Sequence, residues 1–159
     1  TKILFPSNKN YNTAVNYDLK EMLVANICKK LSSLIVRSSI TNNFPVVIGG
    51  DHSIAIGTWH GIANAYNCYQ NLGLIWIDAH MDAHIKQTSP SMAIHGMPLA
   101  ILTGNTDSKP MLTMLKNKLA PILPEHVILI GVRSYEEEEK ILLEKLNIKI
   151  QLSKTFDHL

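Results

Sequence analysis

Short apolar runs alternate along the chain with longer stretches whose apolar residues recur at helical spacing. Four runs predict strands: 46–48, 74–77, 127–130 and 148–150. Five stretches predict helices: 17–37, 54–67, 96–104, 109–118 and 135–146. Residues 1–15 show no such periodicity and are expected to form a loop. Because strands alternate with helices, we expect an α/β fold: a parallel sheet with helices on both faces, undivided by a linker or repeat.

The run 74–77 ends abruptly in a group of carboxylates and imidazoles. It is apolar at every position, which predicts a strand buried on both faces. Parallel sheets place their functional sites just beyond the carboxyl ends of their strands. If the backbone stays extended there, alternation places four side chains on one side of the chain: Asp78, His80, Asp82 and His84. The sequence therefore predicts that four potential ligands converge.

This combination of side chains favours a metal site. Neighbouring carboxylates oppose each other's ionisation unless a positive charge lies between them, and a divalent ion provides it. Oxygen and nitrogen ligands without thiolates suit manganese, iron or zinc, and the absence of a cysteine pair argues against structural zinc. The alternative is that the acidic residues cap the following segment and the histidines lie on the surface. Four such residues at alternate positions favour the metal site.

A glycine turn follows the predicted strand 46–48 and places His52 beyond another strand end. Its sequence, Gly-Gly-Asp-His-Ser at 49–53, allows a tight turn. A phosphate-binding loop is disfavoured because the turn lacks a Gly-Lys-Ser/Thr motif and carries the anionic Asp51. We expect Asp51 or Ser53 to cap the helix that follows.

Composition limits the class of protein and its partners. The 159 residues, 46% hydrophobic and 18% charged, suffice for one domain with a core. A net charge of +2 without a basic cluster does not favour binding of nucleic acid. No apolar run approaches the length of a membrane span. We therefore expect a small-molecule partner. Two isolated cysteines, Cys28 and Cys68, and no signal-peptide pattern make the cytoplasm the expected location.

Three motifs resemble, in order, the signatures of the ureohydrolases, the arginase and agmatinase superfamily. They are Gly-Gly-Asp-His-Ser at 49–53, Asp-Ala-His-Met-Asp at 78–82 and Ile-His-Gly-Met-Pro-Leu at 94–99. The third is most similar to arginase itself. The resemblance extends from about residue 19 to residue 150, and it implies an arginase-like fold.

The resemblance implies a site with two manganese ions that hydrolyses L-arginine to urea and ornithine through a hydroxide bridging the ions. His52 and Asp82 would bind one ion, His80 the other, and Asp78 both. His95 matches a histidine that shuttles protons or positions the substrate, so Asp82 and His95 are the expected catalytic residues. Two residues are expected to contact the substrate: Ser91 and His84. The family also implies a homo-oligomer, a trimer or hexamer.

The chain departs from the family pattern in its ligands. The family's third metal motif, Asp-x-Asp, has no match between Val127 and Leu159. We therefore interpret residues 1–159 as a single partial domain, the amino-terminal portion of a ureohydrolase, which is inactive by itself. His84 and the pair Met92-Ala93 replace residues typical of arginases, which leaves the substrate contacts open.

Other functions stay open beside arginase activity. Agmatinase, guanidinobutyrase and formiminoglutamase activities share the family motifs, and the chain could be a catalytically incomplete metal-binding fragment. A related-fold deacetylase with a single zinc ion is disfavoured by Asp82 and by the glycine turn.

We interpret His60 and His126 as structural, and the acidic run 136–139 as the charged start of a helix. Arg133 could face the ligand or pair with the acidic turn.

Overall fold

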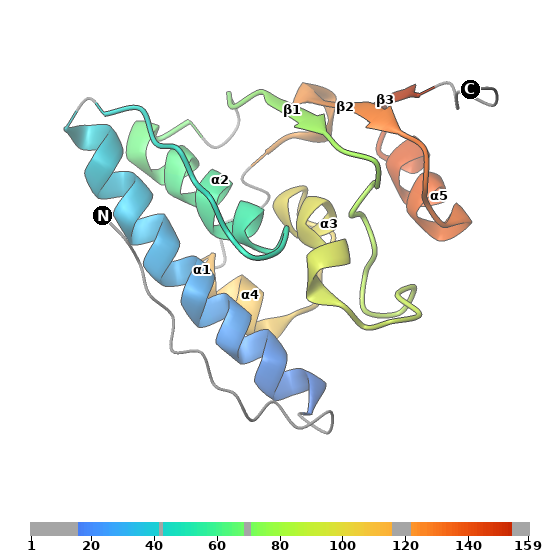
Figure 1. Ribbon diagram of the computed structural model, residues 1–159, viewed down its shortest axis with the longest axis horizontal. Helices are drawn as coiled ribbons and strands as arrows, with labels where there is room; N and C mark the ends of the chain where they lie inside the picture. Colours follow the sequence, from blue (N-terminus) through green and yellow to red (C-terminus); the bar gives the residue numbers. More distant parts are fainter. Residues whose placement is uncertain (1–15, 42, 69–70, 116–121, 154–159) are drawn as a thin grey trace.

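A three-stranded parallel sheet forms one layer of the structure, a computed structural model that describes residues 16–41, 43–68, 71–115 and 122–153. Its strands, in spatial order, are β1 (Leu74–Ile77), β2 (Val127–Val132) and β3 (Lys149–Leu152) (Figure 1). The α-helices are α1 (Tyr17–Ile40), α2 (Ile54–Tyr66), α3 (Pro98–Leu102), α4 (Lys109–Met114) and α5 (Glu137–Lys145). Short 3-10 helices occur at Ile94–Gly96 and Pro124–His126.

Most of the predicted elements are confirmed, with shifted ends. The strands predicted at 74–77, 127–130 and 148–150 are β1, β2 and β3. The helix expected at 96–104 is shorter and follows a 3-10 turn, because Pro98 favours a helix start. Predictions for 1–15 and 116–118 fall outside the described residues. Within the described part of the chain, no helix combines the length and the apolar character needed to cross a bilayer.

The pairing of β1 with β2 continues past the end of β1 and fixes the backbone there. Leu74 pairs with Val127, and Ile77 pairs with Ile130. Beyond the strand, the Asp78 N–H donates to the Ile130 carbonyl at 3.1 Å, and the Arg133 N–H donates to the Ala79 carbonyl at 2.9 Å. These bonds hold Asp78 at the carboxyl edge of the sheet, where the sequence predicted the site.

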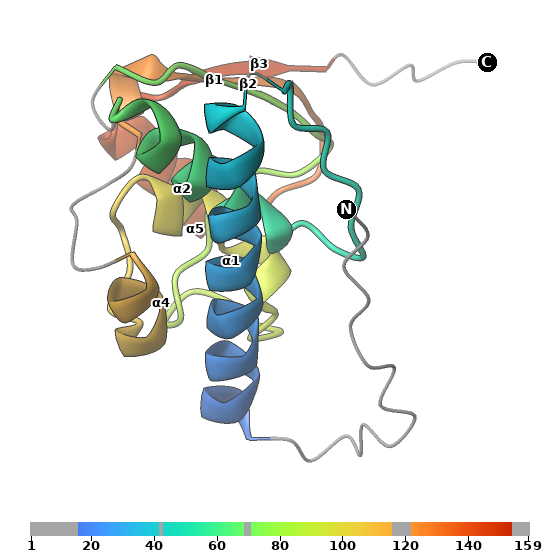
Figure 2. The same ribbon diagram turned by 90° about the vertical axis from the view of Figure 1, so that its left-hand side faces the viewer.

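The helices of the described chain lie on one face of the sheet (Figure 2). On that face Leu74 and Trp76 are buried, whereas Ile75 and Ile77 on the other face are 64% and 77% exposed. The expected parallel α/β sheet is confirmed as an incomplete one, whereas the helices expected on both faces lie on one face only in the described part of the chain. The prediction that residues 74–77 are buried on both faces is wrong for the described structure, because no described element covers the outer face.

The strand predicted at 46–48 is absent from the sheet. Residues 43–49 have no regular secondary structure, and Val46 and Ile48 are 77% and 94% exposed. A strand needs a neighbouring backbone to receive its hydrogen bonds, and none of the described strands pairs with this segment. The apolar run was identified correctly, but an apolar run alone does not make a strand.

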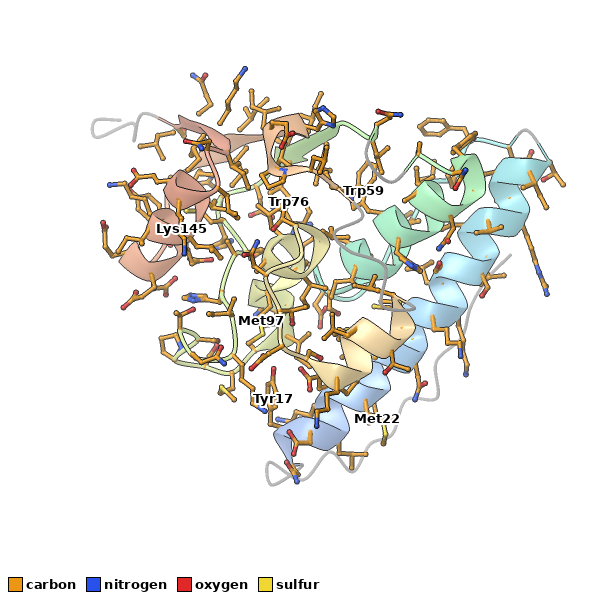
Figure 3. The ribbon with its side chains drawn as sticks, turned by 180° about the vertical axis from the view of Figure 1, so that it is seen from behind. Tyr17, Met22, Trp59, Trp76, Met97 and Lys145 are labelled. Carbon is orange, nitrogen blue, oxygen red and sulfur yellow. The ribbon has the colours of Figure 1, made fainter. Side chains whose placement is uncertain are left out.

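Close packing of α1 against α2 supports the helical layer. A Cβ at Gly57 would lie 2.6 Å from the Cys28 carbonyl oxygen, and one at Gly61 would lie 2.7 Å from Ile35 Cβ. The buried His60 Nδ1 lies 3.1 Å from Ser32 Oγ between the same helices, in agreement with its structural interpretation. The main core lies beneath the sheet, and Trp76 belongs to it (Figure 3). Its buried residues include Leu74, Trp76, Met81, Leu99, Leu102, Leu129 and Leu143.

Candidate metal centre

A turn stabilised by Asp51 presents His52 in front of α2. The Ser53 N–H donates to Asp51 Oδ1 at 2.9 Å, and the Ser53 hydroxyl donates to the same oxygen. Ser53 occupies the N-cap position, but its side chain makes no capping bond. Of the two expected capping residues, Asp51 therefore supplies the side-chain oxygen that orders the turn.

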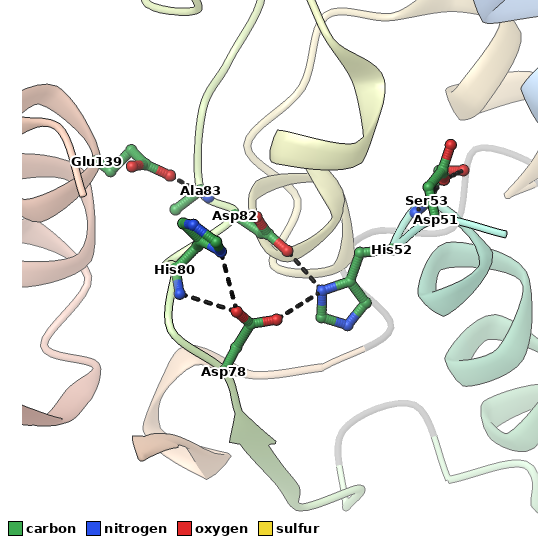
Figure 4. Close-up of polar contacts among 8 residues, drawn as sticks. All are labelled: Asp51, His52, Ser53, Asp78, His80, Asp82, Ala83 and Glu139. Atoms are coloured by element: carbon green, nitrogen blue, oxygen red, sulfur yellow. Dashed lines mark hydrogen bonds and ion pairs between the residues drawn. The ribbon is translucent and has the colours of Figure 1, made fainter. Parts of the chain in front are cut away.

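His52 contacts two carboxylates at the carboxyl end of β1 (Figure 4). Its Nδ1 lies 2.6 Å from Asp82 Oδ2 and 3.0 Å from Asp78 Oδ2. One ligand atom of each of the three residues lies within 4.8 Å of the others. The side chain of Asp82 is 11% exposed and that of His52 is 36% exposed, so the cluster lies at the edge of the core, open to solvent on one side.

His80 lies at the exposed rim of this cluster. Its Nδ1 is 3.2 Å from Asp78 Oδ1, and its backbone N–H donates to the same oxygen at 2.8 Å. The carboxylate of Asp78 thus has one oxygen toward His52 and the other toward His80. The His80 side chain is 61% exposed, so the described residues leave one side of it open.

Bends at residues 79–80 and a left-handed residue, Asp82, interrupt the extended chain after β1. Asp82 has φ +51°, which turns its side chain toward His52. Two backbone bonds hold the loop in this shape: Leu99 N–H to the Asp82 carbonyl, and His84 N–H to the Gly96 carbonyl, both at 2.9 Å. The prediction that four alternating side chains converge is therefore wrong for His84, because the alternation ends at Asp82.

His84 instead joins a second cluster with two glutamates at the start of α5: Glu136 at the N-cap and Glu139 in the first turn. Its Nε2 lies 3.2 Å from Glu136 Oε2 and 3.6 Å from Glu139 Oε2, while its Nδ1 lies 3.1 Å from Thr88 Oγ1. Burial raises the pKa of Glu139, and hydrogen bonds with Glu139 and His84 lower the pKa of Glu136. Both His84 and Glu139 are buried.

Sequence reasoning missed the part that the glutamates play here. Only a helix start was inferred from the acidic run, yet Glu139 is 3% exposed and accepts a hydrogen bond from Ala83 N–H in the loop after β1. The three-residue spacing of Glu136 and Glu139 at a helix start was the available signal, because it is the spacing of a capping box. That spacing identifies a helix terminus, but it does not reveal the loop that packs against it.

His95 and Ser91 are exposed, and no described contact joins either to the His52 cluster. His95 lies in the 3-10 turn whose Gly96 carbonyl accepts from His84 N–H, so the turn is tied to the loop after β1. Ser91 Oγ accepts from Ala93 N–H at 3.2 Å.

Arg133 is exposed and donates to the Gly131 carbonyl at 3.3 Å. His126 is also exposed, which agrees with its structural interpretation.

The electrostatics of the His52 cluster favour a cation between the carboxylates. The hydrogen bond with Asp82 is the largest influence on the pKa of His52, and it raises that pKa despite burial. Asp78 and Asp51 act in the same direction. The raised pKa favours a proton on His52, which places positive charge beside Asp78 and Asp82. A divalent ion supplies the same compensation more strongly, and a donor set of imidazole nitrogen and carboxylate oxygen fits such an ion.

Comparison with known proteins places the chain in a family. The family model described as "Arginase family" matches residues 6–159. The chain belongs to the arginase family. The arginase of Bacillus caldovelox is 45% identical over 142 residues, which are 89% of this chain and 45% of that protein. The chain thus spans about half the length of the curated relatives it matches.

Solved arginase-family structures share the fold. The crystal structure of arginase from Bacillus cereus has a TM-score of 0.76 and 41% identity, over 83% of this chain and 44% of that one. The arginase of Entamoeba histolytica, solved in complex with L-ornithine, has a TM-score of 0.69 and 31% identity, over 80% and 42% of the two chains. The arginase-family resemblance of the three motifs is therefore confirmed, and two groups of candidate metal ligands lie within the matched fold.

Proposed function

We propose that this chain carries part of the active site of a manganese-dependent arginase, which hydrolyses the guanidinium group of L-arginine to urea and ornithine. The observation that carries the proposal is the convergence of His52, Asp78 and Asp82 within 4.8 Å at the carboxyl end of β1. The arginase relatives support the reaction class, and the L-ornithine in the Entamoeba histolytica structure supports an amino-acid substrate.

The geometry supports a division of roles among the ligands. Asp78 directs its two carboxylate oxygens toward two different imidazoles, so it suits a position between two ions. His52 and Asp82 lie on one side of it, and His80 lies on the other. When bound, a pair of divalent ions supplies the Lewis acidity that makes water nucleophilic near neutral pH.

The remaining roles concern the substrate and its protons. Asp82 is a carboxylate within hydrogen-bond distance of His52, so it can accept a proton at Oδ2. His95 is exposed on a turn tied to the loop after β1, where it can exchange protons with the leaving amine. His84 lies beside Glu136 and Glu139, whose negative charge favours a cationic end of the substrate, and Ser91 offers a hydroxyl to the amino-acid end.

The described ligands do not balance the charge of two ions. Asp78 and Asp82 together supply two negative charges in the His52 cluster, whereas two divalent ions carry four positive charges. We therefore propose that residues 1–159 alone hold at most one ion weakly, and that turnover requires further carboxylates. The alternative hypothesis for the isolated chain is thus a metal-binding fragment without activity. The alternative hypothesis for the substrate is agmatine or another guanidinium compound.

Both proposals can be tested with urea assays. In the whole protein that contains this sequence, urea release from L-arginine should require manganese, exceed release from agmatine, and vanish in Asp78→Asn. Preference for agmatine would overturn the arginase assignment. In purified residues 1–159 incubated with Mn²⁺ and dialysed, elemental analysis should find at most one ion per chain and no urea should form. Two tightly held ions with steady urea release would overturn the argument from charge.

A further inference from the structure

The indole of Trp76 stacks on the imidazole of His52. The two ring centroids lie 4.3 Å apart, and the ring planes are inclined by 25°. Trp76 is 3% exposed and projects from the buried face of β1 into the core. The stack therefore joins the rigid centre of the sheet to a half-exposed side chain of the candidate metal centre.

His52 needs a restraint of this kind. Its described polar contacts, with Asp78 and Asp82, are both made by Nδ1. Rotation of the ring by half a turn would exchange Nδ1 with a carbon and break both contacts, and the side chain is exposed enough for such rotation. The Trp76 indole packed against one face of the imidazole hinders that rotation. Such a stack of two rings stabilises the observed orientation by more than its buried area alone would give.

We propose that Trp76 is a positioning residue, which holds the imidazole of His52 in the orientation that binds metal. This inference rests on the proposed metal site. It differs from a role in the core alone, because any apolar side chain of suitable volume could fill the space beneath β1, whereas only an aromatic ring can stack on His52.

The ring of Trp76, and not its N–H, carries this role. Trp76 Nε1 is buried without a hydrogen-bond partner among the described residues. The indole is therefore placed by packing, and removal of the N–H breaks no described bond. Phenylalanine keeps an aromatic face toward His52, while leucine fills part of the volume without one. Trp59 packs against the same core cluster and provides a matched control.

The test compares Trp76→Phe, Trp76→Leu and Trp59→Leu in the chain of residues 1–159. Orientation of His52 is measured without metal by NMR, as the upfield shift that a stacked ring induces in the imidazole protons. Affinity for Mn²⁺ is measured by electron paramagnetic resonance titration. We expect Trp76→Leu to lose the upfield shift and to weaken affinity about 10-fold or more, as for other residues that orient metal ligands. Trp76→Phe and Trp59→Leu should keep the shift and stay within about 3-fold of the wild type.

The outcomes separate this inference from the proposed function. Wild-type affinity in Trp76→Leu, or an equal loss in Trp76→Phe and Trp76→Leu, would overturn the positioning role while the metal site stands. No binding of Mn²⁺ by the wild type, in this chain and in the whole protein, would overturn the metal site and the inference with it. If Trp76→Leu does not fold, the variant Trp59→Phe leaves Trp76 as the only tryptophan. Its fluorescence should then be quenched by Mn²⁺, and half of the quenching should occur at the Mn²⁺ concentration that gives half-maximal binding. Unquenched emission at saturating Mn²⁺ would overturn the inference.

Discussion

The backbone N–H of Ala83 donates a hydrogen bond of 2.9 Å to Oε1 of Glu139, a residue 56 positions later in the chain. The other oxygen of the same carboxylate accepts from the Glu136 N–H at 3.1 Å. Glu139 therefore connects the loop that follows β1 to the start of α5. Since Ala83 comes directly after Asp82, this connection also supports the candidate metal centre.

Loss of the Glu139 carboxylate should destabilise the fold. Glu139→Ala leaves the buried Ala83 N–H without its acceptor, which should lower the free energy of unfolding by about 1–3 kcal/mol. Glu139→Gln keeps a carbonyl acceptor and should cost less. Urea denaturation measures both. Glu138→Ala changes an exposed neighbour and should stay within about 0.5 kcal/mol of the wild type, so an equal loss in Glu138→Ala and Glu139→Ala would contradict the assignment.

Asp78 should matter more for metal binding than His84. Asp78 lies between two imidazoles of the cluster, whereas His84 lies in the separate cluster with Glu136 and Glu139. We expect Asp78→Asn to weaken manganese affinity about 10-fold or more and His84→Ala to change it far less. Elemental analysis of the two variants of the whole protein after dialysis measures the manganese that each retains. Equal losses of metal would refute this ranking.

His95 should act in turnover and not in metal binding. It is exposed and makes no described contact with the His52 cluster. In the whole protein, His95→Ala should retain the manganese content of the wild type while kcat for L-arginine falls about 100-fold, as expected for loss of a positioned proton-transfer group. A parallel loss of manganese would identify His95 as a ligand or as a support for one.

The stability of the metal-free chain should depend on pH through His52. The hydrogen bond with Asp82 raises the pKa of His52 above its ordinary value of 6.5. The folded state thus binds the proton more tightly, so the stabilisation is complete below pH 6.5 and is lost as pH rises through the higher folded pKa. The stability difference between wild type and His52→Asn, measured by urea denaturation with chelator, should be larger at about pH 6 than at about pH 9. A constant difference would show that His52 does not titrate in this way.

Gly57 should be required for the packing of α1 on α2. A Cβ there would lie 2.6 Å from the Cys28 carbonyl oxygen and 2.8 Å from Cys28 Cα, and backbone atoms cannot move aside easily. Gly57→Ala should therefore lower the free energy of unfolding by about 1–3 kcal/mol, although alanine is the better helix former. Gly73→Ala is the control, because among the described residues its Cβ would meet only the His126 carbonyl oxygen, at 3.9 Å. Equal stability of the two variants would contradict the packing argument.

Local sequence pattern determined the elements of this protein and where its chemistry lies. Apolar periodicity identified β1, β2, β3 and the helices, because side-chain spacing follows directly from backbone geometry. The rule that parallel sheets place sites beyond the carboxyl ends of their strands located Asp78 and Asp82 after β1, but the strand that was expected to lead to His52 is absent from the described sheet. The three motifs carried the arginase-family assignment.

Only the tertiary structure decided which polar groups meet and which apolar runs pair. The positive φ of Asp82 ended the expected alternation and sent His84 to Glu136 and Glu139. The run 46–48 has the composition of a strand, yet it stays unpaired in the described sheet. Composition and spacing describe what a segment can bury or bind, whereas hydrogen-bond partners and burial depend on the segments that lie beside it in space.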